Sequence, residues 1–480
     1  MFNLFLILLS SLVFIFNSYY STYGVLLLGM VCTLQSFKKQ GQFNILQLLA
    51  SITLVFAYIL SGVKSLSLEP TILLMLLVVN ISQLKLKPQV VQQISASITI
   101  LSLIFAVFQF VSQDIAYGSF INIYDTKQIF PNAFASLNLI LLAINSKQLR
   151  VANLLNIFLS KSRFAIAISM MYLLYESITK RGFKLRYLTV VSLIAVLSVF
   201  SISKTNQSTE FNSIDQRMEH WINTPKLLKL DHTLLFGYGP HSFEYIYQTV
   251  QRIPENQAPH SHNIVLNLLV ENGMLFVIIF GLLLIKQSRG LNSKYKTALV
   301  LFLIHNLVDL NIQFPLTVLV LLLLFGASQT DHKYTLHRSI KHLPIALNLL
   351  SVSILVLSLN NNFVVSHKDQ LLRDFNTSKN AKLIETYIKQ NPLDKNQLLK
   401  LDEKKYIKDA FLQKPFDVTN LELLLKHYPK ISLNKKWIDN YKNWYLSHSK
   451  QNLNYIHEKG TVKKIRNIFK DLDPEFSDSL

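Results

Sequence analysis

Two histidines standing just before a long apolar segment are the residues of this chain best suited to acid–base chemistry. The segment Pro259-His260-Ser261-His262-Asn263 leads directly into that apolar stretch. An imidazole takes up and releases a proton near neutral pH, so His260 and His262 are candidate proton acceptors. Two histidines at i and i+2 can also ligate a metal, but no third ligand lies at a suitable spacing, and we predict no metal site. The alternative is a hydrogen-bonded structural role.

Two arginines and a His/Asp pair add charge in or beside apolar segments. Arg163 precedes a predicted helix from Phe164 to Tyr175, where the alternative role is a side chain that anchors the helix end. Arg217 lies in a polar loop. His305 and Asp309 are spaced i, i+4 and are predicted to share one face of a helix near its outer end, where they are functional candidates or simply satisfy each other.

The apolar segments predict a bundle of membrane-spanning helices. Half of the 480 residues are hydrophobic. Many segments carry no ionised side chain and approach the roughly 20 residues that a spanning helix needs. We predict an all-α, polytopic membrane bundle of about a dozen such helices, and thirteen can be drawn. The apolar segments are Asn3–Phe16, Ile45–Leu60, Thr71–Leu84, Ile94–Val111, Leu188–Ser203, Ile264–Ile285, Leu316–Phe325 and Leu343–Leu359, and the one acidic residue among them is Glu271.

The basic residues alternate between the two sides of the predicted bundle. Connections after even-numbered helices hold seventeen Lys and Arg residues, whereas the short odd-side connections hold only Lys64, Lys127, Lys161 and Arg163. Basic residues near helix ends stay on the cytoplasmic side, so the N-terminus is predicted inside and the odd-side loops outside. The least secure helix in this count is Val151–Ser160, which is short for a span. The same distribution argues against nucleic-acid binding as the reason for the net charge of +20.

Four regions follow from this topology. Residues 1–203 and 263–359 are the two sets of membrane helices, residues 204–262 form an outer loop, and residues 360–480 form a soluble helical tail on the same outer side. The tail holds 22 of the 48 Lys and Arg residues. Apolar residues at three- and four-residue spacing predict short amphipathic helices within Asn396–Lys414, Asn420–His427 and Trp437–Ser447.

An ordered set of motifs between Phe130 and Asp309 resembles the O-antigen ligase and polymerase superfamily of bacterial inner-membrane glycan transferases, which includes protein O-oligosaccharyltransferases. The motifs in order are Phe130-Pro131-Asn132-Ala133-Phe134-Ala135, Ser162-Arg163, Arg217 with Trp221, Gly237-Tyr238-Gly239-Pro240, His260-Ser261-His262-Asn263, Glu271-Asn272-Gly273, and His305 with Asp309. Met274 stands where a second glycine is common after the Glu271 motif.

The resemblance implies transfer of a glycan from undecaprenyl pyrophosphate on the periplasmic face of the inner membrane. Arg163 and Arg217 would then bind the pyrophosphate, and His262 would act as general base toward the acceptor, with His260 the less favoured candidate. Asn263, Asn132, His305 and Asp309 are supporting residues. No cofactor or metal is implied, because the sugar is already activated, and direct displacement would invert the anomeric configuration.

The resemblance leaves the acceptor open. A long outer tail favours transfer to Ser or Thr of a protein such as pilin, ahead of an O-antigen ligase that acts on the lipid A core, with a polymerase third. A transporter of lipid-linked glycan would use similar arginines, but transporters typically show internal repeats or interrupted helices. Neither is evident in the sequence. A purely structural membrane protein is the remaining alternative.

Overall fold

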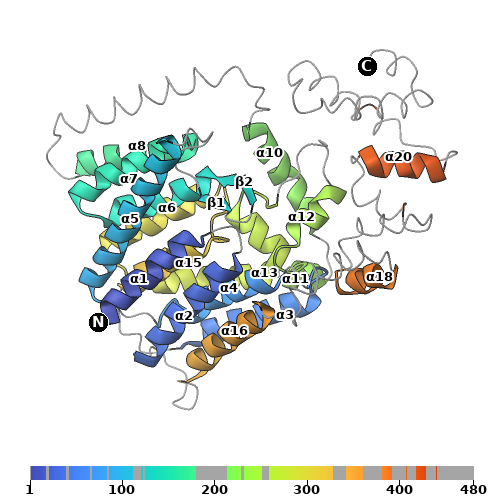
Figure 1. The fold of residues 1–480 in the computed structure, drawn as a ribbon, viewed down its shortest axis with the longest axis horizontal. Coiled ribbons are helices and arrows are strands. Elements are labelled where there is room, and N and C mark those ends of the chain that lie inside the picture. Colours follow the sequence, from blue (N-terminus) through green and yellow to red (C-terminus); the bar gives the residue numbers. More distant parts are fainter. Residues whose placement is uncertain are drawn as a thin grey trace.

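The computed structural model is a bundle of apolar helices (Figure 1). It describes residues 2–17, 21–38, 43–64, 67–83, 86–111, 120–122, 125–179, 213–228, 232–250, 259–327, 342–359, 381–391, 407, 418–428 and 439. The helices are α1 (Phe2–Ile15), α2 (Thr22–Lys38), α3 (Ile45–Leu60), α4 (Leu68–Asn80), α5 (Pro88–Val111), α6 (Pro131–Ile144), α7 (Lys147–Leu159), α8 (Arg163–Thr179), α10 (Ser213–Asn223), α11 (His232–Phe236), α12 (Phe243–Ile246), α13 (Ile264–Ser288), α14 (Ser293–Asn306), α15 (Pro315–Gly326), α16 (Leu343–Leu359), α18 (Ala381–Gln390) and α20 (Val418–His427). Two 3-10 turns, η1 (Thr224–Leu227) and η2 (Tyr247–Thr249), lie in the outer loop.

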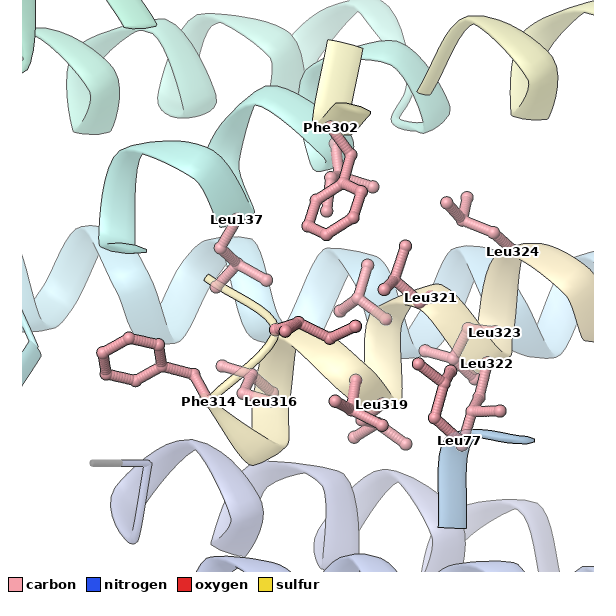
Figure 2. Close-up of a cluster of buried hydrophobic side chains, with 14 of the residues drawn as sticks. Leu77, Leu137, Phe302, Phe314, Leu316, Leu319, Leu321, Leu322, Leu323 and Leu324 are labelled. Atoms are coloured by element: carbon pink, nitrogen blue, oxygen red, sulfur yellow. The ribbon is translucent and has the colours of Figure 1, made fainter. Parts of the chain in front are cut away.

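Helix α15 lies at the centre of the bundle. Every residue of this helix is buried, and it contacts α1, α2, α4, α5, α6 and α14. Figure 2 shows its leucines between Leu77 of α4 on one side and Leu137 of α6 and Phe302 of α14 on the other. A helix that is apolar on all sides is stable only where neither side meets water, which explains this central place.

The outer surface of the bundle is also apolar. Helix α5 exposes Ile100, Ile104, Val107 and Phe108, and α3 exposes a comparable row that includes Ile52 and Phe56. A soluble protein rarely leaves so much contiguous apolar surface in water, whereas a membrane helix presents it to lipid. Pro88–Gln109 and Ile264–Ser288 are long and apolar enough to span a membrane, and seven shorter apolar helices accompany them. The predicted helical membrane bundle is confirmed in class.

The short helix predicted at Val151–Ser160 is present, whereas a short hairpin was missed. Val151–Ser160 belongs to a separate helix, α7, that ends before a turn in which Lys161 has φ 56. A short antiparallel hairpin, β1 (Phe120–Asn122) with β2 (Asp125–Phe130), precedes α6 and was not predicted. Leu188–Ser203 lies outside the described residues, so the count of 12–13 spans stays a prediction, as do the four proposed regions.

Buried amides fasten α5, α6 and α7 together. Asn153 of α7 donates to Asn138 of α6 at 3.0 Å and to Thr99 of α5 at 3.1 Å. Asn145 donates to Asn153 and to Thr99, and it accepts from Ser95. Polar groups in an apolar interior are costly unless paired, so this network holds the first half of α7 against α5 and α6.

Helix α13 is interrupted at Gly273, which has φ 79 and ψ 169. This finding corrects the sequence-based expectation that no helix is interrupted. The break frees carbonyl groups of the first half of α13, and the outer loop supplies their donors. Tyr238 N–H donates to Val270 at 2.9 Å, and Gly239 N–H donates to Glu271 at 2.9 Å. The Gly237-Tyr238-Gly239-Pro240 motif is thus the segment that fills the break.

Substituting Gly273 by alanine should destabilise the protein strongly. Only glycine adopts this backbone conformation freely, and a Cβ here would collide with the backbone of Leu235. Backbone strain of this kind costs about 1–3 kcal/mol before the collision is added. Thermal unfolding in detergent measures the effect. The control is Gly281→Ala in the same helix, where a Cβ meets nothing within 4 Å; equal stability of the two variants would contradict this account of the break.

The described part of the tail is helical. Helix α20 covers the whole of the predicted segment Asn420–His427, whereas α18 was not predicted. Both helices bury apolar side chains, among them Ile384, Tyr387, Leu421 and Leu424. The other two predicted amphipathic segments lie outside the described residues, apart from Ile407 and Asp439.

Candidate active site

The cap of helix α13 holds His262 in an unusual backbone conformation. The Asn263 side chain accepts from Val265 and Leu266 N–H, both at 3.0 Å, and its amide donates to the Leu307 carbonyl at 2.9 Å. His262, one residue earlier, has φ 51. A non-glycine residue in this region is uncommon and persists where the surroundings enforce it, often at functional sites. Asn263, predicted as a supporting residue, thus caps the helix that directly follows His262 and ties it to Leu307.

Asp309 is the direct partner of His262. The His262 Nδ1 lies 3.3 Å from Asp309 Oδ1, which also accepts the Leu310 N–H at 2.9 Å. If Nδ1 carries the hydrogen, Nε2 is left as the acceptor, as a general base requires. Burial favours the neutral carboxyl, but the hydrogen bond from His262 and the nearby imidazoles prevail and hold the pKa of Asp309 below its usual range. The carboxylate is therefore ionised and orients the imidazole.

The pairing of His305 with Asp309 was predicted wrongly. Helix α14 ends at Asn306, so Asp309 lies beyond it and does not share a helical face with His305. The Asn306 side chain accepts the Asn311 N–H at 2.8 Å, which turns the chain out of the helix. His305 Nδ1 instead lies 3.2 Å from the Asn311 side-chain amide. The turn frees Asp309 to meet a residue 47 positions earlier in the chain.

Two further imidazoles surround His262. The His260 ring lies 4.4 Å from that of His262 and meets it edge to face, and the His220 ring stacks on it at 5.5 Å. The His260 Nδ1 accepts the His262 N–H at 3.3 Å. Burial and the neighbouring His262 lower the pKa of His260 well below its usual value, so this ring is neutral and serves as an acceptor. The predicted supporting role of His260 remains a prediction.

His220 is a residue of the site that the sequence did not single out. It lies on α10 with Arg217 and Trp221, and its ring is buried against Tyr247. The signal was present, since His220 follows Arg217 by three residues and shares a helical face with it. Trp221 Nε1 donates to the His262 carbonyl at 3.3 Å, which ties α10 to the start of α13.

The two predicted arginines lie on different helices. Arg217 of α10 is partly buried, and its charge disfavours the protonated form of His260, so the guanidinium lies near the imidazoles. Its Nε atom is buried and makes no hydrogen bond within the described structure. Arg163 is the first residue of α8, and the next residue, Phe164, places its ring 5.9 Å from that of His305. The Arg163 side chain is exposed, and its role in binding pyrophosphate remains a prediction.

Asn132 stands in the first turn of α6, the helix that packs most extensively on α14. Phe130, which immediately precedes α6, contacts Phe314 with ring centroids 5.1 Å apart. These contacts place the N-terminal end of α6 beside the start of α15. The predicted supporting role of Asn132 remains a prediction.

The architecture is that of a helical membrane protein with a His–Asp centre between the start of α13 and the segment that follows α14. Residues 149–281 match the family model described as O-antigen ligase. The match supports the O-antigen ligase and polymerase superfamily, as the motifs predicted, and with it a glycosyltransferase-like activity. It includes Arg163, Arg217 and His262, whereas Asp309 lies beyond it. No curated protein matches the chain.

Proposed function

We propose that this protein transfers an oligosaccharide en bloc from undecaprenyl pyrophosphate to a hydroxyl group on the periplasmic face of the bacterial inner membrane. The observation that carries the proposal is the contact of His262 Nδ1 with the buried Asp309 carboxylate at 3.3 Å. Helix α10, which carries Arg217, is tied to His262 through the Trp221 hydrogen bond. A base oriented by a carboxylate, next to a permanent cation, matches the needs of this reaction.

His262 and the two arginines take part in a single displacement at the anomeric carbon. His262 Nε2 accepts the proton of the acceptor hydroxyl as its oxygen attacks the anomeric carbon. The bond from that carbon to the pyrophosphate oxygen breaks, and the leaving pyrophosphate keeps the electron pair. Arg217 and Arg163 stabilise its developing negative charge. The product has inverted configuration, and the reaction needs no metal or nucleotide.

We favour a protein acceptor such as pilin, because a tail with helices of its own follows the last described apolar helix. The alternatives are an O-antigen ligase acting on the lipid A core and a polymerase. Deleting the gene and comparing pilin mass with lipopolysaccharide banding separates them. A lower pilin mass with unchanged banding is the expected result. Unchanged pilin mass with loss of the O-antigen ladder would identify a ligase instead.

The interrupted helix α13 raises the alternative of a transporter of lipid-linked glycan. In transporters the freed backbone groups of a broken helix bind substrate or ions. Here the N–H groups of Tyr238 and Gly239 donate to the carbonyls of Val270 and Glu271, so the protein itself satisfies the backbone groups that the break exposes. Reconstituted protein that moves lipid-linked glycan across vesicles but never joins it to an acceptor would favour the transporter.

A further inference from the structure

The fold gathers three metal-ligating side chains that the sequence separates. His260, His262 and Asp309 each offer one ligand atom, and these atoms lie within 4.8 Å of one another. Sequence spacing shows only the two histidines, because the third member follows 47 positions after His262. Among the described residues this is the one such group of three.

The distances suit a tetrahedral ion. Zinc binds imidazole nitrogen and carboxylate oxygen at about 2.0–2.2 Å, so two tetrahedral ligands lie roughly 3.3–3.5 Å apart. His262 Nδ1 and Asp309 Oδ1 are already 3.3 Å apart. The third ligand needs only a local shift within the loop that carries both histidines. Asp309 Oδ2 is buried without a hydrogen-bond partner in the described structure, so the carboxylate has unused capacity.

The donor set selects the kind of ion. Two imidazoles and one carboxylate favour borderline metals such as Zn²⁺ over Mg²⁺ or Ca²⁺, which prefer oxygen ligands. The nearby charge of Arg217 opposes any cation and weighs most against ions whose binding is mainly electrostatic. Strong nitrogen–metal bonds can offset that repulsion.

We propose that His260, His262 and Asp309 form an inhibitory Zn²⁺ site, in which the metal takes the place of the proton shared by His262 and Asp309. Its inhibitory role rests on the proposed function. A metal on Nδ1 removes the hydrogen bond that Nδ1–H donates to Asp309 and places a dication on the imidazole, which then no longer accepts a proton at Nε2. Binding itself is independent of any catalytic role.

The test uses tag-free, full-length protein in detergent, stripped with EDTA and titrated with ZnCl₂ by calorimetry. One saturable site is expected. His260→Gln and Asp309→Asn should each weaken binding by about 10-fold or more. His232→Ala, which removes an exposed histidine of α11, is the matched control and should bind zinc unchanged. Size-exclusion profiles establish that each variant is folded. Equal zinc affinity in all variants, or no saturable binding by the parent protein, would overturn the site.

Transfer assays separate this proposal from the proposed function. Zinc should inhibit transfer at the concentrations that fill the site, and EDTA should restore it. Transfer that proceeds unaffected with zinc bound would overturn the inhibitory role and the role of His262 together. Transfer by stripped protein that fails to bind zinc would overturn the metal site and leave the proposed function standing.

Discussion

Replacing His262 with alanine removes glycan transfer while the protein remains folded in the membrane. The proposed base contributes about 10²–10⁴-fold to the rate, which places the variant at or below detection. The change deletes a half-buried ring whose main partners are other imidazoles and Asp309, so the bundle core is left intact. Transfer from extracted lipid-linked glycan to acceptor, with purified protein, measures the effect.

A second variant of the site and a control accompany this measurement. Asp309→Asn keeps the shape but replaces the carboxylate with an amide, so transfer should fall while zinc-free thermal stability changes little. His232→Ala, an exposed histidine of the same loop region, should retain full activity. If His262→Ala transfers glycan at the rate of the parent protein, His262 is not the general base and the proposed mechanism is wrong. If both site variants fail to insert, the pair is structural.

Replacing Arg217 with alanine should also lower the rate of glycan transfer strongly. Removing one preorganised group that stabilises a developing negative charge costs about 10²–10³-fold in rate. Arg217→Lys should recover part of this loss, because lysine keeps the charge but lacks the planar fork. Lys226→Ala removes an exposed charge from the same loop and is the control. Equal losses in Arg217→Ala and Lys226→Ala would show that the loop acts only through its overall charge.

The fold class followed from the sequence because spanning helices must satisfy their own backbone and carry apolar side chains throughout. The same argument located α13 and α15 without any alignment. It could not find the break at Gly273, because the compensating donors come from Tyr238 and Gly239, over thirty residues away in the chain. The β1–β2 hairpin was missed for a related reason, since three- and six-residue strands carry too short an alternation to detect.

The sequence predicted most of the residues of the candidate site but not which of them contact one another. Histidines and arginines beside apolar segments are conspicuous, because charges near lipid are costly to keep. The partner of Asp309 was misassigned because i, i+4 spacing assumes a continuous helix, and α14 ends at Asn306. The three-residue spacing from Arg217 offered a local signal for His220, but its contact with His262 depends on how α10 packs against the start of α13.

Sidedness tests the central claim most directly, since the His–Asp centre must meet lipid-linked glycan on the outer face. The one cysteine, Cys32, is buried, so Cys32→Ala gives a background free of native thiols. In that background, Lys226→Cys in the exposed turn η1 and Ser293→Cys at the exposed start of α14 place single thiols on opposite predicted sides. An impermeant maleimide applied to intact spheroplasts should label position 226, and position 293 only after lysis. The reverse pattern would place the centre in the cytosol and contradict the account.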